Sequence, residues 1–323
     1  MAAKRDMQMR FNVSSLLRDE NSLELETVRK DYEMKIADFI LKSKSWNPFS
    51  KGKAGRDLST EVMIPVHFTE KWQRGVLRAL KTRGDGNCLY RACSKLLCGK
   101  EDLSDLLRVL TSIELFNHQE FYAFHPYVVD KLHVFKSENT AFSATLSDSA
   151  LGDGYDRTNP SSRVVCIKRE AIRNANVGTY ASVVCLFGLS SVAGMSIISV
   201  YPEKLGQETK YSQFLNGSIL PRQVHNNFLD KLVQEVKLII MWTSSGIDFL
   251  PGLSKDFQPN HFVPLVEFKA KAGSMNAKQP KITSLFKTSG SNKEKLPEGK
   301  YFEHEVQHPP VKCGFKCQYG LLL

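Results

Sequence analysis

The hydrophobic positions of residues 1–45 recur at helical spacing. Val28, Tyr32, Ile36 and Phe39 fall three or four residues apart, which places them on one face of a helix. The same spacing predicts helices over several later segments, at residues 70–81, 88–97, 104–123, 126–135, 178–190 and 224–234. A polar segment rich in Gly, Asp, Ser and Pro, residues 146–163, is expected to be a loop.

Three short apolar runs predict strands. They are Met195–Tyr201, Val236–Trp242 and His261–Phe268, each rich in β-branched or aromatic residues. The pattern therefore favours an α+β fold in which helices surround a small antiparallel sheet. Residues 174–202 carry no formal charge and are long enough to span a bilayer. Their Ser and Gly content and their division into a helix and a strand favour a buried helix followed by a central strand.

Composition changes after Phe268. Residues 268–323 hold ten Lys and four Glu, a net charge of +6, so the rest of the chain carries only +4 of the total of +10. We expect a helical extension at 1–70, one folded domain at 71–268 and a basic, disordered tail at 269–323. A basic tail binds nucleic acid weakly at most, and nucleic acid is not the expected partner.

The seven Cys residues form no dense disulfide pattern, and the first residues do not resemble a signal peptide. We therefore expect free thiols in a reducing compartment, cytoplasmic or nuclear.

One cysteine stands where a nucleophile is expected. Cys88 follows the turn signal Gly84-Asp-Gly-Asn and precedes apolar residues at helical spacing, so it should begin a helix. Asn87 is a good N-cap residue, and a helix N-terminus lowers the pKa of a thiol. Gly84 and Gly86 let the backbone turn sharply and present N–H groups to a developing oxyanion.

The base must come from elsewhere in the chain. Of the eight His residues, His261 stands at the start of an apolar strand directly after a loop. A base in that position is held rigidly and faces a cleft. The other seven fall in helical, inter-helical or tail contexts, namely His67, His118, His125, His133, His225, His304 and His308.

Residues 85–92, DGNCLYRA, resemble the nucleophile motif D-G-N-C-L-[FY]-R-A of the ovarian-tumour (OTU) cysteine proteases. Asn260-His261-Phe262 is similar to the histidine motif of that family, and the resemblance covers about residues 76–268. It implies a papain-like thiol mechanism without metal or cofactor. In that mechanism Cys88 attacks the carbonyl after the C-terminal glycine of ubiquitin or a ubiquitin-like modifier, His261 takes the thiol proton, and the backbone of 85–88 holds the oxyanion.

The sequence departs from the family pattern at one position. Many members carry Asp or Asn two residues after the His, where it orients the imidazole, but this chain has Val263. Asp85, whose other expected task is to shape the loop, Asn260 and Asp256 are the candidate replacements. The departure favours an alternative function, a weak or inactive OTU-like domain that binds ubiquitin or a partner.

The tail carries two further motifs. Residues 279–286 resemble the sliding-clamp-binding peptide through Gln279, Ile282, Leu285 and Phe286. This resemblance raises a third hypothesis, a nuclear adaptor whose tail docks on a replication clamp or on nucleic acid. His304 and His308 fit H-E-x-x-H, but Pro309 follows at once and rules against a zinc-binding helix. A small structural zinc site from His304, His308, Cys313 and Cys317 has unusual spacing, and no metal is expected.

Overall fold

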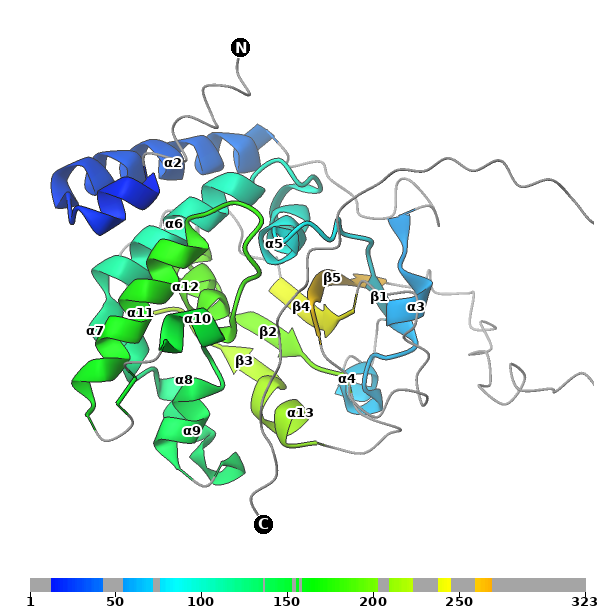
Figure 1. Cartoon of the computed structure of the whole chain (residues 1–323). Helices are drawn as coiled ribbons and strands as arrows, with labels where there is room; N and C mark the ends of the chain where they lie inside the picture. Colours follow the sequence, from blue (N-terminus) through cyan, green and yellow to red (C-terminus); the bar gives the residue numbers. More distant parts are fainter. Residues whose placement is uncertain are drawn as a thin grey trace, which may run out of the picture. The chain divides into compact units, whose positions relative to one another are not determined.

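The computed structural model describes residues 13–42, 55–71, 76–135, 137–152, 155–156, 159–202, 209–222, 238–244 and 259–268 (Figure 1). Several predictions fall outside these ranges. They are the helix at 224–234, Asp256 and every motif of the tail after residue 268.

The N-terminal segment forms helices, as its hydrophobic spacing predicts. Residues 13–18 are helical and are followed by α2 (Ser22–Lys42). The buried face of α2 includes Leu25, Tyr32 and Ile36, and this helix packs along α6 (Ser104–Asn117) (Figure 1). Residues 13–42 therefore share the main hydrophobic core with α5 and α6.

A five-stranded sheet has the order β1-β5-β4-β2-β3. The strands are β1 (Val76–Ala79), β2 (Ile197–Val200), β3 (Gly217–Ile219), β4 (Leu238–Thr243) and β5 (His261–Phe268). The three predicted strands are present, and the α+β class is confirmed. The antiparallel prediction is wrong for one pair, because β2 and β4 run parallel. The chain between them, residues 201–237, is long enough for the crossover that a parallel pair requires.

The first strand corrects another prediction. A helix was expected over 70–81, but the chain forms α4 (Val66–Lys71) and then β1, which pairs with β5. Leu77 and Ala79 point into a small core on one face of the sheet, while Arg78 lies near Glu61. This alternation spans only four residues, too few for a two-residue period to show clearly in the sequence.

The described part of the chain contains further helices besides α2, α4 and α6. Their bounds are α3 (Leu58–Glu61), α5 (Cys88–Cys98), α7 (Gln119–Ala123), α8 (Pro126–Asp130), the 3-10 helix η2 (Leu132–Val134), α9 (Glu138–Ser143), α10 (Asp148–Leu151), α11 (Ser161–Asn174), α12 (Val183–Ala193) and α13 (Lys210–Leu215). Two predicted helices are broken into shorter ones, at 104–123 and 126–135. The expected loop at 146–163 contains α10, and the pattern did not predict α11.

The uncharged segment 174–202 divides as expected into a helix and a strand. All but one residue of α12 are buried, and the helix packs against α6, whose other neighbours include α11 and α5. No helix among the described residues combines the length and hydropathy of a membrane span.

The pairing of β1 with β5 ends at Pro264. This proline lacks an N–H, so it cannot continue the ladder on the side that faces β1. The paired register stops at Ala79 and Leu265, and Leu80 donates a last hydrogen bond to the Pro264 carbonyl. Beyond it the chain leaves the sheet as residues 81–87, which lead directly into α5.

A buried histidine predicts how stability depends on pH. His125 caps α8 through Nδ1, which accepts the Tyr127 N–H at 3.2 Å, and its ring stacks 4.2 Å from that of Phe187. Burial lowers the pKa of His125 to about 4, whereas an unfolded histidine titrates near pH 6.5. The unfolded chain therefore binds more protons in this window. Stability is lost as pH falls from about 6.5 towards 4, by at most roughly 3 kcal/mol.

Chemical denaturation at several pH values checks this expectation. The matched variant is His125→Asn, which keeps a capping acceptor but does not titrate. Its free energy of unfolding should fall less steeply than that of the wild type between pH 6.5 and 4. Equal slopes in the two proteins would rule out His125 as the source.

Candidate active site

Cys88 is the first residue of α5. The turn before it depends on Gly86, whose φ of 80° lies in the left-handed region. The side chain of Cys88 is 1% exposed, and its thiol interacts with the backbone N–H groups of Leu89 and Phe262. The second contact places the sulfur beside the residue that follows His261. The structure thus brings both predicted residues to the same end of β5.

Burial dominates the ionisation of the thiol. It raises the pKa of Cys88 to about 11, against the opposing effects of the two backbone N–H groups and the Arg108 guanidinium. At neutral pH the resting side chain is therefore a neutral thiol, in spite of its position at a helix N-terminus.

His261 begins β5 and pairs with Thr243 of β4. Burial lowers the pKa of its imidazole, although the Thr82 backbone and the Asp57 and Asp85 carboxylates favour the charged form. Its Nδ1 is buried and has no hydrogen-bond partner among the described residues. No hydrogen bond between this ring and the Cys88 thiol is present in that part of the chain either.

The position of the expected orienting residue is apolar. Val263 is fully buried in the small core that also holds Leu265 and Met241. Asn260 donates its backbone N–H to the Thr243 carbonyl at 3.1 Å. Since Nδ1 lacks a partner within the described residues, neither Asn260 nor Asp85 orients the imidazole through it in this arrangement.

Asp85 shapes the loop before the nucleophile. Its carboxylate accepts the Asn87 N–H at 3.1 Å and two hydrogen bonds from Arg91, at 3.0 and 2.5 Å. Burial disfavours the charged form of Asp85, but these hydrogen bonds outweigh it and lower the pKa. Arg91 also contacts Glu101 at 3.1 Å. The motif acid and the motif arginine therefore fix the loop 84–87, in which Gly84 is exposed.

Asn87 occupies the N-cap position of α5, but its side chain makes no capping hydrogen bond. Its Oδ1 instead accepts a hydrogen bond from Arg108 Nε at 2.7 Å. The backbone N–H of Asn87 donates a hydrogen bond to the Asp85 carboxylate. The N–H groups of Gly84, Asp85, Gly86 and Cys88 donate to no described residue. Those of Gly86 and Cys88 are the candidate oxyanion donors.

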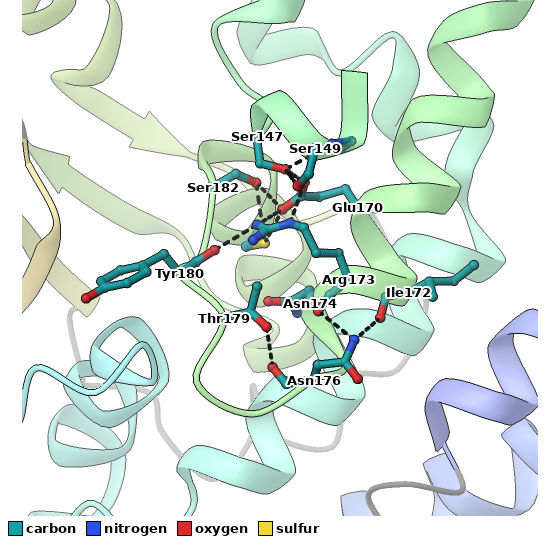
Figure 2. Close-up of polar contacts among 12 residues, drawn as sticks. Ser147, Ser149, Glu170, Ile172, Arg173, Asn174, Asn176, Thr179, Tyr180 and Ser182 are labelled. Atoms are coloured by element: carbon teal, nitrogen blue, oxygen red, sulfur yellow. Dashed lines mark hydrogen bonds and ion pairs between the residues drawn. The ribbon is translucent and has the colours of Figure 1, made fainter. Parts of the chain in front are cut away.

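The loop between α11 and α12, residues 175–182, covers the nucleophile loop. The Gly178 carbonyl lies against Gly86. Figure 2 shows how this α11–α12 loop is fixed: Thr179 Oγ1 donates to the Asn176 carbonyl at 2.7 Å, and Arg173 Nη2 donates to the Tyr180 carbonyl at 2.7 Å. At its end, Ser182 Oγ donates to buried Glu170 at 2.8 Å.

Sequence reasoning missed Arg108 and Asn174, which connect these loops. One signal was present: Arg108 is a charged residue on the face of α6 that carries Leu107 and Thr111, and all three are buried. A lone arginine on such a face indicates a buried polar network.

The fold and the nucleophile motif define an OTU-type domain. A family model described as "Vertnin, OTU domain" matches residues 79–243, which is just over half of the chain. This chain therefore belongs to that family of OTU domains. The matched range includes Cys88 but ends before His261.

A curated relative agrees with this assignment. Vertnin of Danio rerio is 29% identical over 218 residues, which cover 65% of this chain. The aligned part spans 28% of the relative's own length.

Proposed function

We propose that the chain is a thiol-dependent hydrolase that cleaves isopeptide bonds of ubiquitin or a ubiquitin-like modifier. Cys88 is the nucleophile and His261 the general base. The observation that carries the proposal is the position of the Cys88 thiol, at the start of α5 and beside the Phe262 N–H. This position is adjacent along β5 to an imidazole that has an unused nitrogen.

The proposed reaction begins from a neutral pair. His261 takes the thiol proton while the Cys88 sulfur bonds to the carbonyl carbon of the modifier's C-terminal glycine. The N–H groups of Gly86 and Cys88 receive the oxyanion. The imidazolium then protonates the departing lysine amine, which leaves a thioester. Water hydrolyses the thioester with His261 again as base, and the thiol is regenerated.

Two features predict a slow enzyme. The thiol and imidazole are not hydrogen-bonded at rest, so substrate binding has to bring them together. Nothing at Val263 holds the ring in a productive orientation, and an orienting carboxylate is worth several orders of magnitude in kcat in the serine protease triad.

Turnover of ubiquitin with a fluorogenic C-terminal amide tests the proposal. The wild type should release the fluorophore, and Cys88→Ala should reduce release to background while still binding ubiquitin. The base must be neutral, and burial lowers the pKa of His261. The acid limb of kcat/KM should therefore lie below pH 6.5 in the wild type and disappear in His261→Ala. Wild-type turnover that persists in Cys88→Ala would contradict the assignment.

A second candidate is a ubiquitin-binding or partner-binding OTU-like module without catalysis. The observations that favour it are the buried, neutral thiol and the apolar Val263. The turnover experiment separates the two, because a binding module should bind ubiquitin with equal affinity in the wild type and in Cys88→Ala while neither releases the fluorophore.

Docking on a sliding clamp through residues 279–286 stays a prediction, as do the domain limits at residues 70 and 268. Deletion of residues 275–290 should remove clamp binding and leave ubiquitin turnover unchanged.

A further inference from the structure

We propose that Arg108 is the positioning residue of the Cys88 site. Its guanidinium clamps the nucleophile loop to the α11–α12 loop, and it supplies the positive charge that stabilises the thiolate when it forms. The inference rests on the proposed function in taking Cys88 as the nucleophile.

The contacts of Arg108 show how it clamps the two loops. In the nucleophile loop, Nε donates to Asn87 Oδ1 at 2.7 Å and Nη2 donates to the Gly86 carbonyl at 2.5 Å. On the other side, Nη2 donates to the Thr179 carbonyl at 2.8 Å, and Nη1 donates to the carbonyls of Asn174 at 2.8 Å and Asn176 at 3.1 Å. A sixth, longer contact joins Nη1 to Asn174 Oδ1 at 3.4 Å. Together these contacts use all three nitrogens of the guanidinium.

No carboxylate of the described residues forms an ion pair with this side chain. Arg108 is 1% exposed, and every hydrogen-bond acceptor it has within the described residues is a neutral amide or carbonyl oxygen. It also lies over the Tyr90 ring, with its Cζ 4.6 Å from the ring centroid. An arginine stays protonated even when buried, so a full positive charge is present in a dry interior where unpaired charge is costly.

The nucleophile is one of the ionisable groups that this charge affects. Burial raises the pKa of Cys88 and lowers that of Arg108, and the attraction between the thiolate and the guanidinium opposes both shifts. Tyr90 and Cys185 are two further groups that become anions and interact with Arg108. Tyr90 and Cys185 are fully buried and have pKa values well above neutral. Cys88 alone of the three stands at the proposed reaction centre, next to a base.

A residue with a structural role alone would make the same hydrogen bonds. The experiment therefore separates the effect of the Arg108 charge from the effect of its hydrogen bonds. Arg108→Lys keeps the charge and loses most of the clamp, whereas Arg108→Gln loses both the charge and most of the clamp. Arg163→Gln is the matched control, because Arg163 is also buried but its Nη atoms bind Glu138 and Asn139, outside this site.

The measurement is the rate at which iodoacetamide alkylates Cys88 at pH 8 in the 323-residue chain. Trypsin cuts after Arg83 and Arg91, so the peptide 84–91 carries Cys88 as its one cysteine, and mass spectrometry follows it apart from the other thiols. Loss of the charge should raise the thiol pKa. We therefore expect alkylation to be about tenfold slower in Arg108→Gln than in Arg108→Lys, because less thiolate is present at pH 8. Arg163→Gln should react as the wild type does.

Equal rates in Arg108→Lys and Arg108→Gln, or a faster reaction in Arg108→Gln, would overturn the proposal. If Arg108→Gln shows no cooperative unfolding transition, Arg108→Lys decides the question. A rate within about threefold of the wild type supports a role for the charge, and a tenfold loss in folded protein contradicts it. The assay uses no ubiquitin, so a wild type that alkylates but never turns over ubiquitin would refute the proposed function and leave this inference standing.

Discussion

Replacing Gly86 with Ala will destabilise the fold and disable the Cys88 site together. Gly86 has a φ of 80°, which costs a residue with a Cβ about 1–2 kcal/mol. An added Cβ would also lie 2.8 Å from the Gly178 Cα and closer still to the Gly178 carbonyl group. Backbone atoms cannot move aside as a flexible side chain can, so we expect a further cost of roughly 1–3 kcal/mol.

Gly178→Ala provides the control for this change. Gly178 has nearly the same φ, 82°, but its added Cβ would meet only the Asp85 carbonyl oxygen, at 3.9 Å. Both variants therefore incur the backbone cost, and Gly86→Ala alone forces the nucleophile loop away from the α11–α12 loop. Denaturant unfolding should show Gly86→Ala as the less stable variant by more than 1 kcal/mol. Equal stability of the two variants would contradict the close packing of these loops.

Glu170→Ala is the second change with a large expected effect. Glu170 is 0% exposed, forms an ion pair with Arg173, and accepts hydrogen bonds from Ser147 at 2.5 Å and Ser182 at 2.8 Å. Figure 2 shows these groups converging on the carboxylate. Removing Glu170 leaves the half-buried Arg173 charge without its carboxylate and two serine hydroxyls without their acceptor, which costs up to roughly 3–5 kcal/mol.

The free energy of unfolding measures this cost directly. Glu26→Ala is the control, because Glu26 forms the same kind of (i, i+3) pair with Arg29 on α2, but both side chains are partly exposed. The Glu26–Arg29 pair should contribute less than about 1 kcal/mol to the free energy of unfolding. Arg173 also holds the Tyr180 carbonyl, so Glu170→Ala should speed amide hydrogen exchange in residues 175–182. A loss of stability no greater than that of Glu26→Ala would show that the buried pair is dispensable.

The sequence predicted the fold where its patterns were long and regular. The strands β2, β4 and β5 and the helices α2, α5 and α12 follow clear apolar runs or helical periods. It failed at β1, where four residues give too little alternation to be distinguished from a helical segment. The parallel pairing of β2 with β4 was also missed, because the direction of a strand depends on the path of the connecting chain.

The candidate site was predicted in part for similar reasons. Asp85, Cys88 and the glycine turn stand in one continuous motif, and the structure places them as a unit at the start of α5. The contacts of Arg108 and Glu170 join segments 12 to 71 residues apart, and such contacts depend on the packing of α6, α11 and α12. The buried state of Cys88, which makes the resting thiol neutral, likewise follows from tertiary packing and is not visible in its motif.

Reaction of the 323-residue chain with a ubiquitin probe that carries a C-terminal electrophile tests the central claim most directly. We expect the wild type to gain the mass of one probe, located by mass spectrometry on Cys88 within peptide 84–91. We expect Cys88→Ala to gain none and His261→Ala to react more slowly. A folded wild type that forms no adduct with ubiquitin or ubiquitin-like probes, or an adduct on another cysteine, would contradict the thiol-hydrolase account.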